Sequence, residues 1–340
     1  MGPERPAGRW RAHRPAGVFV GLSTLDVVHR VQRAPGANEK VTAGRQDVAA
    51  GGPAANAAVV FAALGGDAVL VTALGSDPLA DFISGELGGQ GVRTIDVTPD
   101  DPEPPAISAV AVTEHSGERS VVSPDAGTRS LPTPGELEQF VDNLLASGAD
   151  VVLIDGHHPA LALAAARAAG RRGVPLLVDA GRWKPVMAEL LPMADDVVCS
   201  ADFRWPGTAG PDESATVLRQ LPSADAARRP DDPPTRRLVA VTHGGSPIQW
   251  WQGERFGSVP VPAVVAVDTL GAGDAMHGAY AFLRTDPDLS VTERLAGAAA
   301  VAALRCSIIG PREWLTELES LTLTGQRNLA HHTSTGQGQS

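Results

Sequence analysis

The chain has 340 residues, and its 39 acidic side chains against 28 Lys and Arg give a formal net charge of −11 at pH 7. This acidic balance argues against a general binder of nucleic acid or anionic membranes, because such surfaces need clustered basic residues. Hydrophobic residues make up 43% but aromatics only 4%, and Gly and Pro number 37 and 28, which suits an α/β protein packed by Ala, Val and Leu.

The two ends of the chain differ from its middle. Residues 1–16 contain Arg, Pro and Gly but no apolar core of a secretory signal, so we expect a disordered basic lead and a cytoplasmic protein. No apolar run approaches the roughly 20 residues that span a membrane. Residues 324–340 are polar and aperiodic, which predicts a disordered tail, and 222–237 reads as a surface insertion. One domain is therefore expected over 17–323.

Short apolar runs alternate with helix-like segments through this domain. The expected strands lie at 17–22, 68–74, 151–155, 174–179, 197–199 and 238–242. Helical patterns cover 53–64 and 160–169. Continuous apolar strands that alternate with helices indicate a central, mainly parallel sheet with helices on both faces.

Two segments, 27–48 and 107–122, interrupt this rhythm. They are more polar than the buried runs and alternate as strands do. We expect them to form a small sheet that projects from the main body. Such a lid would shield a group-transfer reaction from water.

A glycine-rich turn near the C-terminal end carries the chemistry. It reads DTLGAGD, follows a β-like segment at 259–267 and precedes a helical pattern. Gly271, Ala272 and Gly273 would thus lie where a strand gives way to a helix. Small residues let a ligand approach the backbone, and free N–H groups at a helix start attract anions. Phosphoryl transfer needs such a site for the charge on the moving group.

Asp274 closes this turn and would begin the helix. A carboxylate there can accept the proton of a hydroxyl beside a bound phosphate. The alternative is an N-cap with no further role, which is common at such positions. The whole run from Asp268 favours the catalytic reading, because the surrounding motif gives the match its context.

Four motifs together resemble the ribokinase-like, or pfkB, carbohydrate kinase family. They are GLSTLD at 21–26, GGPAAN at 51–56, ALGSD at 73–77 and DTLGAGD at 268–274. They occur in the expected order from about residue 17 to 321. The GGPAA and AMHGA runs resemble the ketohexokinase-like and sulfofructose-kinase-like branch more than ribokinase itself. The resemblance implies a ribokinase-like three-layer sandwich with a β-sheet lid over the sugar.

The resemblance also implies roles for single residues. Asp26, which would end the first strand, contacts acceptor hydroxyls together with Gly52 and Asn56. Asp274 is the base, and the amides of Gly271, Ala272 and Gly273 hold the transferring phosphate. ATP is the phosphate donor, and the residues on its side are Thr242, Gly244, Thr269, Gly271 and Gly273.

Metal ligation is where the chain departs from many relatives. The region 199–203 lacks the Asn-x-x-Glu motif that they use with Mg²⁺ and phosphate, and Asp202 is a weak substitute. Mg²⁺ would then be held mostly by ATP oxygens and water. The resemblance further implies a K⁺ site, formed by backbone carbonyls near residues 306–312 with Asp268 contributing.

The sequence allows two interpretations of several side chains. Lys40 and Arg119 in the lid could bind an acidic group on the acceptor, or be solvated. Arg suits bidentate anion recognition better than Lys. His157 and Asp179 follow apolar strands and could line the crevice at the strand ends.

Three functions remain open on the sequence. The first is a kinase for a ketose, a ribose-like sugar or an acidic sugar. The second is a nucleoside kinase of the same fold, although little aromatic content in 27–48 is available to stack on a base. The third is a sugar or nucleotide sensor without catalysis. Relatives dimerise through the lid, so a homodimer is a further expectation.

Overall fold

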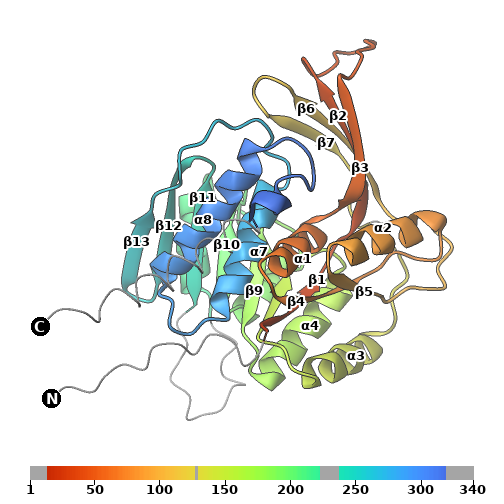
Figure 1. The fold of residues 1–340 in the computed structure, drawn as a ribbon. Coiled ribbons are helices and arrows are strands. Elements are labelled where there is room, and N and C mark those ends of the chain that lie inside the picture. The colour runs from red at the N-terminus through yellow and green to blue at the C-terminus, as the bar shows by residue number, and fades with distance from the viewer. Residues whose placement is uncertain (1–13, 127–128, 223–236, 319–340) are drawn as a thin grey trace, which may run out of the picture.

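The computed structural model describes residues 14–126, 129–222 and 237–318. Figure 1 shows a main body built around one large sheet, from which a smaller sheet projects. The predicted tail lies outside the described residues, as do nearly all of the lead and of the 222–237 insertion. No helix within the described ranges is long and apolar enough to cross a membrane.

The main sheet has nine strands in the order β13-β12-β11-β10-β9-β8-β1-β4-β5. Seven neighbouring strands run parallel, while β12 and β13 pair antiparallel at one edge. The bounds are β1 Ala16–Val20, β4 Asp67–Thr72, β5 Val92–Asp96, β8 Val151–Ile154, β9 Leu176–Ala180, β10 Asp196–Cys199, β11 Leu238–His243, β12 Ser246–Gln252 and β13 Arg255–Val259. The predicted α/β class is confirmed.

Helices cover both faces of this sheet, as its continuous apolar strands require. One buried cluster joins the sheet to helices α1 Pro53–Ala63, α2 Pro78–Gly89, α7 Ala272–Arg284 and α8 Val291–Ser307. The other cluster joins it to α3 Pro134–Ala146, α4 Pro159–Arg172, α5 Met187–Leu190 and α6 Pro211–Gln220. A short 3-10 turn, Leu191–Met193, follows α5.

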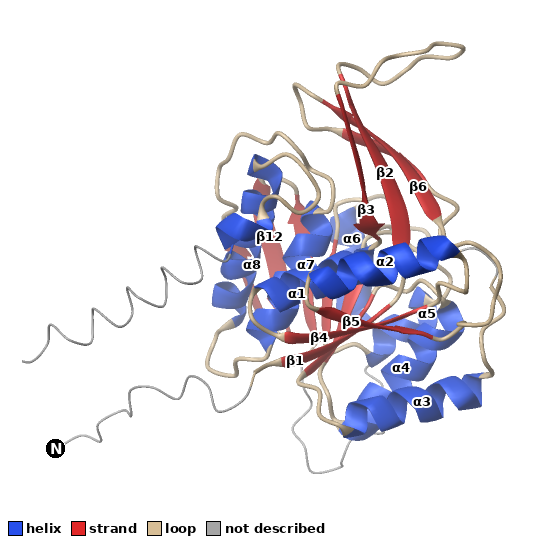
Figure 2. Ribbon diagram, turned by 45° about the vertical axis from the view of Figure 1, so that its right-hand side comes forward, coloured by secondary structure: helices blue, strands red, loops and turns tan. Residues whose placement is uncertain are grey.

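The projecting sheet has four strands in the order β3-β2-β6-β7. Their bounds are β2 Thr24–Val31, β3 Arg45–Gly51, β6 Ile107–Thr113 and β7 Arg119–Val122. They come from the two segments that the sequence marked as polar and alternating. Figure 2 shows this sheet rising above α1 and α2 at the end where the parallel strands finish.

Two local expectations were wrong. The segment 259–267 is not a strand beyond Val259, and its residues form an irregular approach to the glycine-rich turn. Val264 and Val265 are exposed there, since no neighbouring strand pairs with them. Asp26 does not end the first strand. It lies within β2, because the chain leaves the main sheet at Gly21 and enters the small sheet at Thr24.

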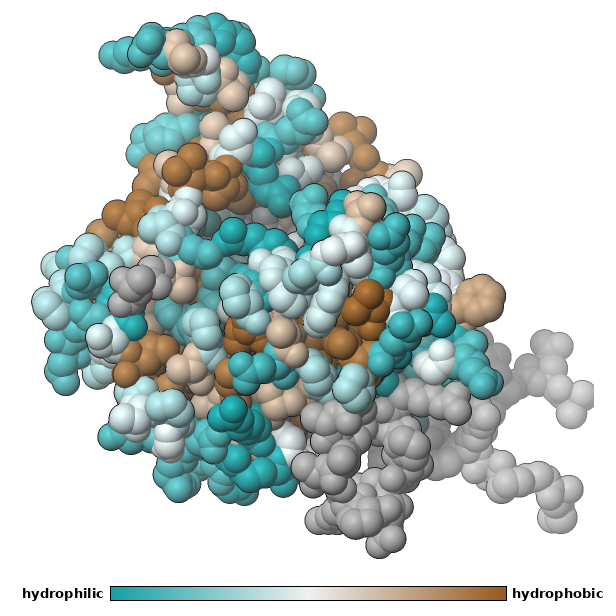
Figure 3. All heavy atoms as spheres, turned by 180° about the vertical axis from the view of Figure 1, so that it is seen from behind, coloured by the Kyte–Doolittle hydropathy of each residue, from teal (hydrophilic) through white to brown (hydrophobic). Residues whose placement is uncertain are grey.

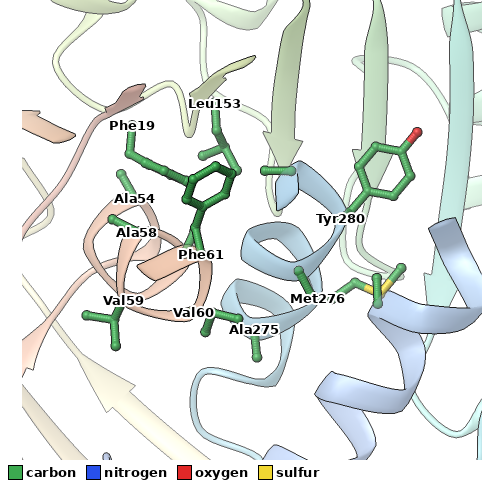
Figure 4. Packing of buried hydrophobic residues seen from close by; sticks show 14 of the residues in the cluster. Phe19, Ala54, Ala58, Val59, Val60, Phe61, Leu153, Ala275, Met276 and Tyr280 are labelled. Atoms are coloured by element: carbon green, nitrogen blue, oxygen red, sulfur yellow. The ribbon is translucent and has the colours of Figure 1, made fainter. Parts of the chain in front are cut away.

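The core beneath the small sheet is built on α1 and α7. Figure 4 shows Phe19 of β1, Phe61 of α1 and Leu153 of β8 packed together, with α7 alongside. The rings of Phe19 and Phe61 meet edge to face, with centroids 5.3 Å apart. Phe61 also meets Phe282 edge to face, so this packing joins the C-terminal parts of α1 and α7.

Candidate active site

The close packing of α1 against α7 creates the central contact of the site. A Cβ atom at Gly278 would lie 2.3 Å from the carbonyl oxygen of Ala57, so only glycine allows the two backbones to approach this far. As a result Asn56 and Asp274, which are 218 residues apart, meet: Asn56 Nδ2 donates to Asp274 Oδ2 at 2.8 Å.

Asp274 is half-buried in the first turn of α7. Burial and the negative charge of Asp179 raise the pKa of Asp274 to about 6, against the opposing hydrogen bond from Asn56 and the charges of His277 and Arg119. The carboxylate is therefore more basic than an ordinary aspartate, yet still ionised at neutral pH. This is the condition expected of a general base.

The turn before Asp274 has the geometry of an anion site. Gly271 is the N-cap residue of α7 with φ 72°, a conformation that favours glycine. Nothing lies within 4 Å of the position where a Cβ on Gly273 would be, so this side of the turn is open. The Ala272 N–H is partly committed, since it donates to the Thr269 carbonyl at 3.3 Å.

The His277 side chain contacts the backbone of this turn, and the sequence did not predict this contact. Its Nδ1 lies 2.7 Å from the Gly273 carbonyl oxygen, and its Nε2 lies 3.1 Å from that of Val198. Asp179 Oδ1 is 3.4 Å from the same Nε2. The spacing of four residues between Gly273 and His277 on one helix was the signal that could have suggested the contact.

Asp26 enters the site from the small sheet. A Cβ on Gly51 would lie 2.0 Å from Asp26 Oδ2, so glycine at this position makes room for the carboxylate. Burial raises the pKa of Asp26, against hydrogen bonds from Thr24 and Ser108 and the charge of Arg312. Asp26 is thus a strong acceptor for a hydroxyl group.

Gly52 sits where the small sheet meets α1. Its φ is 95°, and a Cβ there would lie 2.4 Å from the Leu22 carbonyl oxygen. The buried Asp155 carboxylate accepts from the Leu22 and Ala54 N–H groups at 2.9 and 3.2 Å. Asp155 thereby links the segment before β2, at Leu22, to the first turn of α1, at Ala54.

A pocket opens between the small sheet and the main body. Its lining residues are Asp26, Val28, Ala49, Ala50, Asn56, Val60, Leu270, Gly271, Ala275, Arg305, Pro311, Arg312 and Trp314. Arg312 organises one wall: its guanidinium donates to Asn56 Oδ1 at 3.1 Å, to the Ala50 carbonyl at 2.7 Å and to Glu86 at 2.9 Å. No motif or spacing in the sequence predicts the contact between Arg312 and Asn56.

The tip of the β6–β7 hairpin rests on the loop before α7. Gly117 has φ 66°, and a Cβ there would lie 2.8 Å from the backbone carbon of Val267. The Thr269 N–H and hydroxyl both donate to the Gly117 carbonyl, at 3.1 and 2.8 Å. Arg119 reaches Thr269 Oγ1 at 3.4 Å and so lies beside the turn.

The other predicted residues are more distant from this cluster. Thr242 lies at the end of β11, two strands beyond β9, and Gly244 follows that strand. Thr242 Oγ1 donates to the Cys199 carbonyl at 3.3 Å. Lys40 is exposed in the loop between β2 and β3 at the far tip of the small sheet and does not line the pocket (Figure 1).

A charged cluster links the small sheet to the main body. His157, at the end of β8, lies between Asp125, which follows β7, at 2.6 Å and Asp155 at 3.1 Å. Burial acts to lower the pKa of His157, but the two carboxylates raise it to about 9. Burial also acts to raise the pKa of Asp155, yet the charges of His157 and Lys184 hold it below its usual value.

Within the described ranges, no group of three or more His, Cys, Asp or Glu side chains is arranged to hold a metal ion. Asp202 is exposed, and its backbone N–H donates to Ser200 Oγ at 3.0 Å. Divalent metal binding at Asp202 stays a prediction.

Comparison with known proteins matches the chain to one family. The pattern of the pfkB family carbohydrate kinases covers residues 17–317. A ribokinase from Arabidopsis thaliana is 28% identical, over 88% of this chain and 78% of that protein. An ATP-dependent ribose-1-phosphate kinase from Halopiger xanaduensis is 31% identical, over 86% of this chain and 92% of that protein.

A solved structure shares the fold. It is that of the Arabidopsis thaliana ribokinase complexed with ribose and ATP, with a TM-score of 0.67 and 24% identity. The match covers 90% of this chain and 99% of that one.

Proposed function

Because this chain belongs to the pfkB family of carbohydrate kinases, we propose that it transfers the γ-phosphoryl group of ATP to a hydroxyl of ribose or a ribose derivative. That the protein is a sugar kinase follows from its family. The contact that carries the finer proposal is the Asn56–Asp274 hydrogen bond, because it fixes a basic carboxylate beside an open glycine turn. The relatives named ribokinase and ribose-1-phosphate kinase support ribose or a ribose derivative as the acceptor.

The mechanism places each group in one step. The acceptor lies against Asp26, Gly52 and Asn56, with one hydroxyl on Asp274. That oxygen attacks the γ-phosphorus, the bond to the ADP oxygen breaks, and the hydroxyl proton passes to Asp274. Amides of the Gly271–Gly273 turn and the N-terminus of α7 stabilise the charge on the transferring group.

The remaining groups bind ATP and cover the reaction. Mg²⁺ would be held mostly by ATP phosphate oxygens and water, and it would supply positive charge against the phosphoryl oxygens. Thr242 and Gly244 line the nucleotide side, and Arg119 beside Thr269 contacts a phosphate oxygen. The small sheet excludes water while transfer takes place.

Ribose is favoured over a nucleoside as the acceptor. Of the pocket-lining residues, Trp314 is the aromatic one, and it is 3% exposed in the core. A nucleoside would require an accessible stacking surface for its base. A sensor without catalysis is disfavoured because a non-catalytic protein gains nothing from the raised pKa of Asp274.

The test measures ADP release with Mg-ATP and separate acceptors: ribose, deoxyribose, ribose 1-phosphate, fructose, fructose 6-phosphate and adenosine. We expect turnover with ribose or ribose 1-phosphate, and none above background with Asp274→Asn. Turnover with adenosine alone would replace the proposal by a nucleoside kinase. ATP binding without turnover on any acceptor would favour the sensor.

We also propose that a second copy of the chain covers the outer face of the small sheet. Val48, Val27, Ala109 and Val122 stand side by side across its four strands and so point to one face. Val122 is 75% exposed, and Val48 is 45% exposed. Seen from behind, brown apolar patches lie on and below the projecting part (Figure 3).

This interface is tested by measuring mass in solution by light scattering. We expect a dimer that Val122→Asp converts to a monomer. Phe256→Asp is the matched control, because Phe256 is as exposed but lies on β13 at the opposite edge of the molecule. A monomeric wild-type chain at high concentration would contradict the proposal.

A further inference from the structure

Asp268 lies six residues before Asp274 and is held by two buried arginines. It is 2% exposed, and Arg30 and Arg305 are each 3% exposed. Asp268 Oδ2 is 3.3 Å from Arg30 Nη1, an ion pair without a hydrogen bond, and 3.4 Å from Arg305 Nη2. Two positive charges therefore face one negative charge inside the protein.

The arginines also occupy the neighbouring oxygen atoms. Arg30 Nη2 donates to the Val267 carbonyl at 2.7 Å, and Arg305 Nη1 donates to the Ile308 carbonyl at 3.1 Å. Val267 lies in the loop before α7, and Ile308 follows the end of α8. The two segments meet at this point, because the Val267 N–H donates to the Cys306 carbonyl at 2.8 Å.

These are the atoms from which a K⁺ site would be built. K⁺ binds carboxylate and carbonyl oxygens in place of its water shell. Here guanidinium groups already take these oxygens, and a further cation would be repelled by two fixed positive charges. The residues present do not fit the monovalent-cation site that the family resemblance implies.

We propose that Arg30 and Arg305 replace this cation, so that the kinase works without K⁺. The inference rests on the proposed phosphoryl transfer at Asp274. Arg30 and Arg305 act as positioning residues: they fix the Asp268 carboxylate, and its Oδ1 accepts from the Leu270 N–H at 3.1 Å. Leu270 leads directly into the Gly271 turn, so the arginines orient the amides that face the phosphate.

The two charges come from different parts of the molecule. Arg305 belongs to α8 of the main body, whereas Arg30 belongs to β2 of the small sheet. On β2, residues 26 and 30 are separated by an even number of positions and so share a face. Asp26 contacts the acceptor, and Arg30 supplies the second positive charge beside Asp268. Both residues thus move together with β2. A lifted small sheet would withdraw one of the two guanidinium groups.

The direct test needs no variant. Turnover of the full chain is measured with KCl from 0 to 100 mM, with choline chloride keeping ionic strength constant. We expect kcat/KM to change less than twofold. Melting temperature in KCl against choline chloride, and thallium(I) binding followed by its NMR signal, should likewise show no site-specific effect. More than fivefold stimulation, or a K⁺-specific rise in Tm, would overturn the proposal.

Variants then test the arginine itself. In choline chloride, Arg30→Met should lower kcat/KM at least tenfold, with part of the loss restored by KCl. Arg33→Met is the matched control, because Arg33 is exposed and pairs with Glu39 just beyond β2. Unchanged Arg30→Met activity in choline chloride would contradict the role. If Arg30→Met does not fold by circular dichroism, Arg30→Lys keeps one charge and should remain K⁺-independent but slower.

The outcome is separable from the proposed function. Absence of turnover in every salt and with every acceptor would refute the kinase proposal. The thermal-shift and thallium measurements on the wild-type chain would still decide whether this site takes a monovalent cation.

Discussion

Asp268 lies in the loop before α7 and Asp274 in the first turn of that helix, yet the protein gives their carboxylates opposite surroundings. Asp268 is enclosed by two guanidinium groups and accepts from the Leu270 and Gly310 N–H groups. Asp274 has a neutral amide as its hydrogen-bond partner and a second carboxylate, Asp179, as a neighbour. The environment, not the residue type, makes one a fixed structural charge and the other a base.

Replacing the base should give the largest effect. Asp274→Asn should lower kcat by roughly 10²–10⁴ while ATP binding persists. The folded pKa of about 6 lies above the ordinary 3.8, so this group costs stability that accumulates as pH rises from about 4 to 6 and stays constant above that. The variant should therefore melt a few degrees higher at pH 8. Calorimetry and the ADP assay check both, and retained turnover would remove Asp274 from the mechanism.

Replacing the structural charge should change stability in the other direction. Asp268→Asn leaves two buried guanidinium groups without their counterion and should cost about 3–5 kcal/mol. Urea denaturation measures this. Asp67→Asn is the control: its pair with Arg14 is more than half exposed and should be worth under about 1 kcal/mol. Equal losses in the two variants would mean that the buried pairs of Asp268 contribute no more to stability than an exposed ion pair.

The pH profile sharpens the comparison further. Turnover should rise with pH through an apparent pKa of about 6 as Asp274 ionises. Because the Asn56 hydrogen bond lowers that pKa, Asn56→Leu should move the midpoint upward and reduce the maximum. Log(kcat/KM) against pH on both proteins tests this. An unmoved midpoint would assign the titration to another group.

A third arrangement, at His157, should give the smallest effect. Its folded pKa of about 9 exceeds the ordinary 6.5, so its stabilisation is complete below about 6.5 and lost as pH rises through 9. His157→Gln should therefore cost on the order of 2 kcal/mol at pH 6 and much less at pH 10. Unfolding by urea at both pH values checks this, and a pH-independent cost would indicate packing alone.

Much of the fold could be predicted because its local signals agree. Buried strands are continuously apolar, and the small sheet alternates, so the two sheets differ in pattern. The segment 259–267 misled because its valines favour a strand, while strand formation also needs a partner edge that β13 does not offer there. The valine-rich composition of this segment could not show that the strand ends at Val259.

The site was predictable only where a motif marks it. Asn56 and Asp274 each lie in a recognisable run, and their hydrogen bond brings the two motifs together. Arg30 sits in an unremarkable alternating strand, 238 positions from Asp268. No local pattern predicts ion pairs that join the small sheet and α8 to a loop, so only the tertiary structure shows them.

Gly117 sets how closely the small sheet can approach the loop before α7. The hairpin tip meets the Val267 backbone directly, with no side chain between them. At this contact, the distance between the small sheet and the loop before α7 is thus set by backbone dimensions rather than by side-chain size. The side chains that line the pocket can then differ to admit different acceptors, while the hairpin tip keeps its distance from the glycine turn.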